Sequence, residues 1–464
     1  MRHPDTELNL AEEHFCRAKM LLANLLQLPT ILKELGDEPD APASMVYTQA
    51  PTLWLLVLQR LGGGLTLEQA VADLIENHSD ILPPNRRVIE GTLSRNNSAY
   101  NNARKRLPIE VIEEFSHRIC DHLARRAEPI FLGKRVFIID GTTITLPPTP
   151  ALKKAFPPAT NQHGESVWPV AMLMVAHEMQ TGCALVPQVS AMYGPNNSSE
   201  ARQAELVIDR LPENSIVMGD SGFGIFSVAF HCQTRGQEFL FRLTKQRFNA
   251  LLKNATLIDQ DAGFRTYHLI WKPSSKERNH HPHLDANSAV EVFIHQVDLD
   301  NGDTLELVTN VEVDGMSAAE LYQRRYDVEF DIRDVKVTMD TENIRAKSVD
   351  TMMKELHGSV IAYNLVAQVR KQAAKLTNVP PRRLSFSGVW LDFQHGLLRK
   401  EFSTLEQWTL AYHKTLVNAS ARQLPNRKRP RSFPRVAHTR RQKSTKFQKQ
   451  QRKKQSQSLP TPPD

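Results

Sequence analysis

The chain has 464 residues, of which 41% are hydrophobic and 23% charged, and its net charge is +7. This composition is typical of a large soluble globular protein. The longest apolar runs, such as 53–58, are far too short to form a membrane-spanning helix. Four scattered cysteines without a CxxC motif argue against a zinc site or a disulfide framework, and the acidic N-terminus argues against a signal peptide. We therefore expect a cytoplasmic protein.

The positive charge is concentrated at the C-terminus. Residues 422–464 contain fourteen Lys and Arg and one acid, a net charge of +13, so the rest of the chain carries −6. This tail has few apolar residues and is predicted to be disordered. We expect it to bind DNA non-specifically and to release it in salt; a tail that serves only solubility is the alternative.

Residues 1–128 are predicted to be a mostly helical DNA-binding region. Apolar residues recur at helical spacing in four stretches: 8–28, 52–61, 67–75 and 109–123. A polar helix capped by Ser98 would carry Arg104, Lys105 and Arg106, and such side chains bind base edges and phosphates. With 67–78 it could form a helix-turn-helix-like unit, although a solvated polar helix explains the pattern equally well.

Residues 129–243 contain two buried strands that each end in an acid. The apolar run 136–139 leads to Asp140, and the run 215–218 leads through Gly219 to Asp220. Further strands are expected at 167–176 and 183–191, with Gly182 at the turn, and a helix at 198–211. One strand that ends in Asp is a weak signal, whereas two of them indicate a site at one edge of a sheet.

Residues 244–313 are predicted to be β-rich. Strands are expected at 264–271, 289–297 and 304–311, separated by polar loops. His280, His281 and His283 are more consistent with a solvated loop than with a metal site, because no Cys or spaced acid accompanies them. We expect Trp271 to be a packed strand residue.

Residues 314–421 begin with a predicted helix over 317–336, capped by Ser317, and continue with helices at 349–372, 384–397 and 405–417. The first helix has an inward apolar stripe, with Asp327, Asp331 and Asp334 on the far side. Five side chains share one edge of it: Tyr322, Arg325, Glu329, Arg333 and Lys336. One acid among cations suits a metal ion beside a polyanion; an amphipathic helix with ordinary i,i+4 ion pairs is the alternative.

The spacing Tyr322-x2-Arg325-x3-Glu329-x6-Lys336 resembles the YREK signature of DDE transposases from bacterial insertion sequences of the family 4 type. The resemblance covers roughly residues 130–370 and includes a YNL sequence at 363–365. It implies an α/β fold with an RNase H-like core split by a β-rich insertion. Two positions depart from the common pattern: Ile332, where relatives often have Phe, and Ser221, where they often have Arg.

The resemblance also implies a function. Asp140, Asp220 and Glu329 would hold two Mg²⁺ ions, with Mn²⁺ able to substitute, for in-line phosphoryl transfer. Tyr322, Arg325, Arg333 and Lys336 would bind the DNA near the cut. The expected protein is a nucleoid-associated transposase that acts as a dimer on double-stranded transposon ends and target DNA. The alternatives are a non-catalytic DNA-binding protein derived from such a transposase, and a metal-dependent nuclease without transposition.

Overall fold

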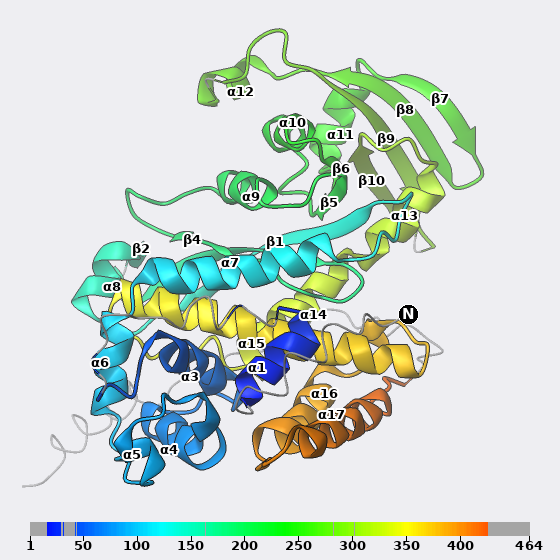
Figure 1. Cartoon of the computed structure of the whole chain (residues 1–464). Helices are drawn as coiled ribbons and strands as arrows, with labels where there is room; N and C mark the ends of the chain where they lie inside the picture. The colour runs from blue at the N-terminus through cyan, green and yellow to red at the C-terminus, as the bar shows by residue number, and fades with distance from the viewer. Residues whose placement is uncertain are drawn as a thin grey trace, which may run out of the picture. The chain divides into compact units, whose positions relative to one another are not determined.

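The computed structural model describes residues 16–28, 31, 42, 44–162, 164–281, 283–300 and 302–425 (Figure 1). Those up to Leu424 belong to one compact unit. The predicted basic tail beyond Pro425, and the first residues of the helix predicted at 8–28, lie outside the described residues. No helix in the described ranges is both long and apolar enough to cross a membrane.

The N-terminal part is helical as predicted. Its elements are α1 (Arg17–Leu21), η2 (Leu22–Leu26), α3 (Gln49–Leu61), α4 (Leu67–Asn77), η3 (Ser79–Ile81), α5 (Arg86–Ile89), α6 (Ser98–Arg106) and α7 (Ile109–Arg125). The predicted cap at Ser98 is wrong, because Asn97 precedes the helix and Ser98 is its first residue. A different helix, α4, has a full capping box, which Thr66 forms with Gln69.

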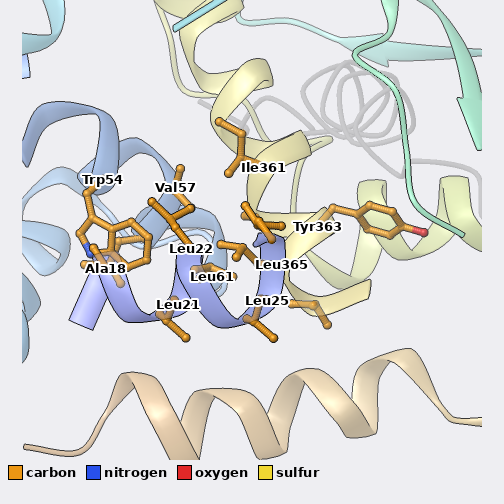
Figure 2. Close-up of a cluster of buried hydrophobic side chains, with 14 of the residues drawn as sticks. Ala18, Leu21, Leu22, Leu25, Trp54, Val57, Leu61, Ile361, Tyr363 and Leu365 are labelled. Carbon is orange, nitrogen blue, oxygen red and sulfur yellow. The ribbon is translucent and has the colours of Figure 1, made fainter. Parts of the chain in front are cut away.

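These helices share one apolar core with a long helix from the C-terminal half, α15 (Val349–Leu376). Helices α3 and α7 both pack on α15. Figure 2 shows side chains of this core, with Leu61 of α3 and Leu22 of η2 near Leu365 of α15, and Trp54 of α3 on the far side near Ala18 of α1. The N-terminal helices are therefore bound to the rest of the unit by buried side chains.

The sheet is built around β1 (Arg135–Thr145), which lies between an antiparallel and a parallel neighbour. On one side it pairs antiparallel with β3 (Gly164–Glu178), to which β2 (Pro158–Asn161) and β4 (Gln188–Ala191) also pair. On the other side β5 (Ser215–Gly219) and β6 (Glu238–Arg242) continue in parallel. This α/β arrangement confirms the predicted RNase H-like core, although the strand predicted at 183–191 is regular only from Gln188.

Helices α8 (Pro150–Ala155), α9 (Glu200–Ile208) and α10 (Phe226–Thr234) are interspersed with these strands. Helix α9 packs on β3 and β4, and α10 packs on β6 and on α9. Their apolar residues join the inward side chains of β1 and β5 in a second core cluster. Strands β1 and β5, which lead to Asp140 and Asp220, are therefore held in place by packing as well as by hydrogen bonds.

The predicted β-rich segment extends this sheet. Its elements are α11 (Lys245–Leu252), β7 (Thr256–Asp261), β8 (Phe264–Trp271), α12 (Ser275–His280), β9 (Val290–Asp298) and β10 (Thr304–Thr309). Strand β10 pairs antiparallel with β6, so the sheet runs on through β9 and β8 to β7. Trp271 is buried and its ring lies 5.7 Å from that of Phe226, as expected of a packed strand residue.

The remaining helical elements follow β10. They are α13 (Gly315–Gln323), η4 (Arg324–Tyr326), α14 (Asp327–Arg333), η5 (Asp334–Thr338), α15, η6 (Pro381–Arg383), α16 (Phe386–Phe393), η7 (Gln394–Leu398) and α17 (Leu405–Ser420). Helices α16 and α17 pack on α15. The YNL residue Asn364 hydrogen-bonds both the N–H and the carbonyl of Ala184, which joins α15 to the segment after β3.

Buried histidines make the fold sensitive to acid. Burial lowers the pKa of His295 and of His357 to about 4. A histidine with a depressed pKa stabilises the fold fully above its unfolded pKa near 6.5, and this contribution is lost as the pH falls. We expect His295→Gln and His357→Gln each to flatten the decline in unfolding free energy between pH 6.5 and 5.5 by roughly 1 kcal/mol. The exposed control His413→Gln should not, and parallel curves for all variants would contradict this assignment.

Candidate active site

Asp220 follows the last residue of β5 as predicted, but the strand end predicted at Asp140 is wrong, because β1 continues to Thr145 in pairing with β3. Both acids nevertheless lie at the edge where the parallel pairing of β1 with β5 ends. Ile138 of β1 pairs in parallel with Met218 of β5, and Asp140 and Asp220 each come two residues later. Neighbouring strands run about 4.8 Å apart, so this register places the two acids side by side. Each carboxylate also accepts a backbone N–H, from Gly141 (2.8 Å) and from Gly222 (2.7 Å).

The proximity of the acids is visible in the pKa of Asp140, which is raised from 3.8 to about 6. Burial is the largest cause, and the negative charge of Asp220 adds to it. The guanidinium of Arg325 opposes the rise, whereas Glu329 contributes to it weakly. The site therefore brings carboxylates together in a place that is only partly exposed to solvent.

A fourth carboxylate, Glu200, lies beside the two aspartates. A Cβ atom at Gly141 would come within 2.7 Å of Glu200 Oε1, and one at Gly222 within 3.9 Å of Glu200 Oε2. Glu200 is the first residue of α9, after the cap Ser199. The sequence analysis missed it because its only local signal is that of an acid in the first turn of a helix.

The segment that carries Glu329 is less regular than predicted. It changes from α-helix (α13) to a 3₁₀ turn (η4), back to α-helix (α14) and then to a π-helical turn (η5). The predicted cap Ser317 is wrong: Asp314 is the cap, and its Oδ1 accepts the Ser317 N–H at 2.9 Å. The 3₁₀ turn η4 and the π-helical turn η5 shift the residues around Glu329 from the positions of an ideal α-helix, and irregular turns of this kind are common at functional sites.

Arg325 connects this segment to the strand acids. It is buried, with one guanidinium nitrogen 3.7 Å from Asp140 Oδ2 and another 2.9 Å from Glu329 Oε1. Tyr322, one turn earlier, is also buried and packs in the cluster that includes Val328. Asp140, Arg325 and Glu329 therefore form a connected group, as the predicted edge of the helix requires.

The two other predicted cations differ in their surroundings. Lys336 Nζ lies 2.8 Å from the carbonyl of Thr143 and 3.3 Å from Thr142 Oγ1, so it contacts β1 just beyond Asp140. Arg333 is exposed, and its guanidinium lies 5.3 Å from the centre of the Phe330 ring. Lys336 thus lies close to the acids, whereas Arg333 faces solvent.

The basic residues predicted in the N-terminal region are only partly exposed. Arg104 is buried and forms an ion pair with Glu355, which also pairs with Arg60 at 3.1 Å. Arg106 donates to the carbonyl of Tyr47, and Lys105 is exposed. Arg104 and Lys105 line a cavity of about 670 Å³ to which Arg345 and Lys347 also contribute.

The donor set of the site suits a hard divalent cation. Asp140 and Asp220 offer carboxylate oxygens, which Mg²⁺ and Mn²⁺ prefer, and the missing side chain at Gly141 lets the Glu200 carboxylate approach them. Within the described ranges, no three His, Cys, Asp or Glu side chains are close enough together to hold one ion. Glu329 instead joins the group through Arg325.

The ionised form of Asp140 should cost stability. Because its folded-state pKa near 6 exceeds the usual 3.8, the cost is full above pH 6 and vanishes below 3.8. We expect Asp140→Asn to raise the unfolding free energy by roughly 1–3 kcal/mol at pH 7.5 without divalent ions, and by about 0.5 kcal/mol at pH 4. Denaturant unfolding would measure both values. The exposed control Glu213→Gln should change neither, and a destabilised Asp140→Asn at pH 7.5 would refute the assignment.

Comparisons with known proteins find similar sequences. The chain is 24% identical over 403 residues to Transposase InsG for insertion sequence element IS4 of Escherichia coli (strain K12), with 84% of each chain covered. A cryo-EM structure of a piggyBac transposase synaptic complex with hairpin DNA aligns at 10% identity and TM-score 0.43 over 92% of this chain and 88% of its own, too weakly to support an argument. Residues 132–365, which include Asp140, Asp220 and Glu329, match the model of the family described as Transposase DDE domain, and the chain therefore belongs to the DDE transposases.

Proposed function

We propose that Asp140, Asp220 and Glu329 are the catalytic residues with which this transposase cuts transposon ends and joins them to target DNA. The observation that carries the proposal is the shared sheet edge of Asp140 and Asp220, with Glu329 attached to Asp140 through Arg325. The raised pKa of Asp140 supports it, because like charges held together in a fold usually mark a functional site.

The three carboxylates are proposed to hold two Mg²⁺ ions, for which Mn²⁺ would substitute. Such ions supply a nucleophile at neutral pH and neutralise charge on the leaving oxygen. The role of the protein is then to fix the carboxylates and the scissile phosphate relative to each other. Gly141 and Gly222 help by donating backbone N–H groups that orient Asp140 and Asp220.

Arg325, Arg333 and Lys336 are proposed to bind DNA phosphates around the cut, with Tyr322 packing behind them. Lys336 lies beside β1 next to Asp140 and Arg333 is exposed on α14, so both are within reach of a strand that crosses the site. Arg325 is positioned to balance the carboxylates as well as a phosphate. Glu200 would add negative charge beside Asp140 and Asp220.

The N-terminal region is proposed to contribute DNA contacts at the cavity beside α6. Lys105, Arg345 and Lys347 line it, and within the described part of the chain no acid forms an ion pair with Lys105 or Lys347. Thr149 Oγ1 donates to the carbonyl of Lys347, which places the cavity near the chain that leaves β1. Arg104 would support this surface through Glu355, and Arg106 through Tyr47.

A dimer on paired transposon ends, binding both ends and target DNA, is part of the same proposal, as is a cytoplasmic location on the nucleoid. A transposase derivative that binds DNA without cutting it is the second candidate, and a nuclease without transposition is the third. The presence of all three acids disfavours the second. Terminal inverted repeats beside the gene would distinguish a transposase from both.

The site assignment predicts a separation of cleavage from binding. We expect Glu329→Gln and Asp220→Ala to lower Mg²⁺-dependent cleavage of DNA from the gene's flanks by more than about a hundredfold. Removing a residue that only supports a metal ligand lowers activity roughly ten- to hundredfold, and removing the ligand itself should lower it further. Gel-shift affinity for the same DNA should stay within a few-fold of wild type. Loss of binding together with cleavage would indicate a structural role for the mutated acid.

The cavity beside α6 predicts a change in salt dependence. Each phosphate contact contributes about 0.9 to the slope of log affinity against log salt, so the double variant Lys105→Ala, Lys347→Ala should reduce the slope by about 2. Fluorescence anisotropy at several salt concentrations would measure it. Exposed Lys400 and Lys414, changed together to Ala, provide the matched control. Equal slopes for both double variants would remove the cavity from the DNA interface.

A further inference from the structure

A buried arginine–aspartate pair lies on the side of α14 that faces away from Glu329. Asp331 is 1% exposed, and the Arg382 guanidinium of η6 donates to both of its oxygens, Nη1 to Oδ1 at 2.9 Å and Nη2 to Oδ2 at 2.7 Å. The Tyr363 hydroxyl lies 3.2 Å from Asp331 Oδ1. A two-bond pair of this kind fixes direction as well as distance.

The same group is anchored to the end of β3. Arg382 Nε donates to the carbonyl of Met179 at 2.6 Å, and His177 Nδ1 lies 3.8 Å from Asp331 Oδ2. The carbonyl of Gly182 lies 2.9 Å from the Tyr363 hydroxyl and 3.0 Å from His177 Nδ1. Arg382, Tyr363 and His177 therefore surround one buried carboxylate from three elements, and the carbonyls of the turn after β3 hold these side chains in place.

Gly182 shows how tightly the turn after β3 fits this group. Its φ is +80°, and a Cβ atom there would come within 2.6 Å of Arg370 Nη2 and 2.8 Å of Asp331 Oδ1. A side chain at this position would have to displace the Asp331 carboxylate or the arginine. The turn that follows β3 therefore packs against α14 so closely that a side chain at Gly182 has no room.

One end of this connection lies two residues from a proposed catalytic acid, and the other lies two residues from the strand partner of another. Asp331 follows Glu329 by two residues, which is about 200° around the helix, so a restraint on Asp331 sets the direction of Glu329. His177 follows Val175 by two residues on β3, and Val175 is the Cα partner of Asp140 on β1. The pair therefore links the helix that carries Glu329 to the strand that is paired with Asp140.

We propose that Asp331 and Arg382 are positioning residues for Glu329, a role that rests on the proposed active site. They hold α14 at a fixed rotation against β3, so that the Glu329 carboxylate is presented toward Asp140. Without Arg382, Asp331 would be a buried charge without its partner, and α14 would have to turn or move to hydrate it. Glu329 would then lose its alignment although its own side chain is unchanged.

The test compares metal binding and metal preference with stability. We expect Asp331→Asn and Arg382→Gln to weaken Mn²⁺ binding, measured by isothermal titration, roughly ten- to hundredfold, the usual effect of losing a residue that supports a metal ligand. Mg²⁺-supported cleavage should fall more than Mn²⁺-supported cleavage, because Mg²⁺ demands near-ideal geometry. Arg382→Lys, which keeps the charge but not the fork, should lie between wild type and Arg382→Gln.

The chain offers a matched control in Asp121 and Arg210, a second pair in which one arginine contacts both carboxylate oxygens, at 2.9 and 2.7 Å, between α7 and the residues after α9. Asp121→Asn should lower the melting temperature without changing Mn²⁺ affinity or the Mg²⁺ to Mn²⁺ ratio of cleavage rates. If the Asp331 and Arg382 variants behave like this control, the pair is only structural and the proposal is overturned.

A milder variant keeps the test decisive if Asp331→Asn does not fold. Tyr363→Phe removes one hydroxyl from the group, and we expect a few-fold loss of Mn²⁺ affinity, whereas wild-type affinity and metal preference would count against the proposal. Glu329→Gln separates this failure from failure of the active site itself. If Glu329→Gln also keeps wild-type Mn²⁺ affinity and cleavage, the assignment of Glu329 is wrong; if it loses both while the Asp331 and Arg382 variants do not, only the positioning role is wrong.

Discussion

The repulsion between carboxylates at one sheet edge is the constraint on which the rest of this structure depends. Asp140 and Asp220 are brought together by the register of β1 and β5, and burial together with the charge of Asp220 makes the charge of Asp140 costly. Nearby groups offset that cost without removing it: backbone N–H groups at the glycines, and Arg325 between Asp140 and Glu329. A fold that only needed to be stable would replace one of these acids, so their retention points to a ligand of opposite charge.

The third acid has to be brought to this edge from outside the sheet. More than a hundred residues separate Asp220 from Glu329. The strands between them extend the sheet that contains β1, so this long segment is itself part of the ordered fold. Glu329 is carried by helix α14, and the opposite side of that helix carries the buried Asp331, which Arg382 holds. Placement of the strand acids is thus a property of backbone pairing, whereas placement of the helix acid depends on side chains.

The sequence predicted those features that depend on short-range patterns. Apolar runs ending in Asp140 and Asp220 identified the strands, and helical spacing identified the edge shared by Arg325, Glu329 and Lys336. It could not predict that Glu200 would lie beside Gly141, or that Arg104 would be paired with Glu355, because both contacts join residues far apart in the chain. Capping was misjudged at Ser98 and Ser317, where a neighbouring Asn or Asp lies one or three residues earlier. The 3₁₀ and π turns around α14 likewise follow from tertiary packing, which periodicity does not register.

The shared core of α15 with the N-terminal helices has a consequence for how such proteins diversify. Leu22 and Leu61 pack in one core with Ile361 and Leu365, so the surface of α15 is shaped by residues about three hundred positions away. A recombination event that exchanged only the N-terminal segment for that of a distant relative would join two halves of a core that do not interlock. New surface properties of the N-terminal helices should therefore arise by point substitution on exposed helix surfaces more readily than by exchange of the whole segment.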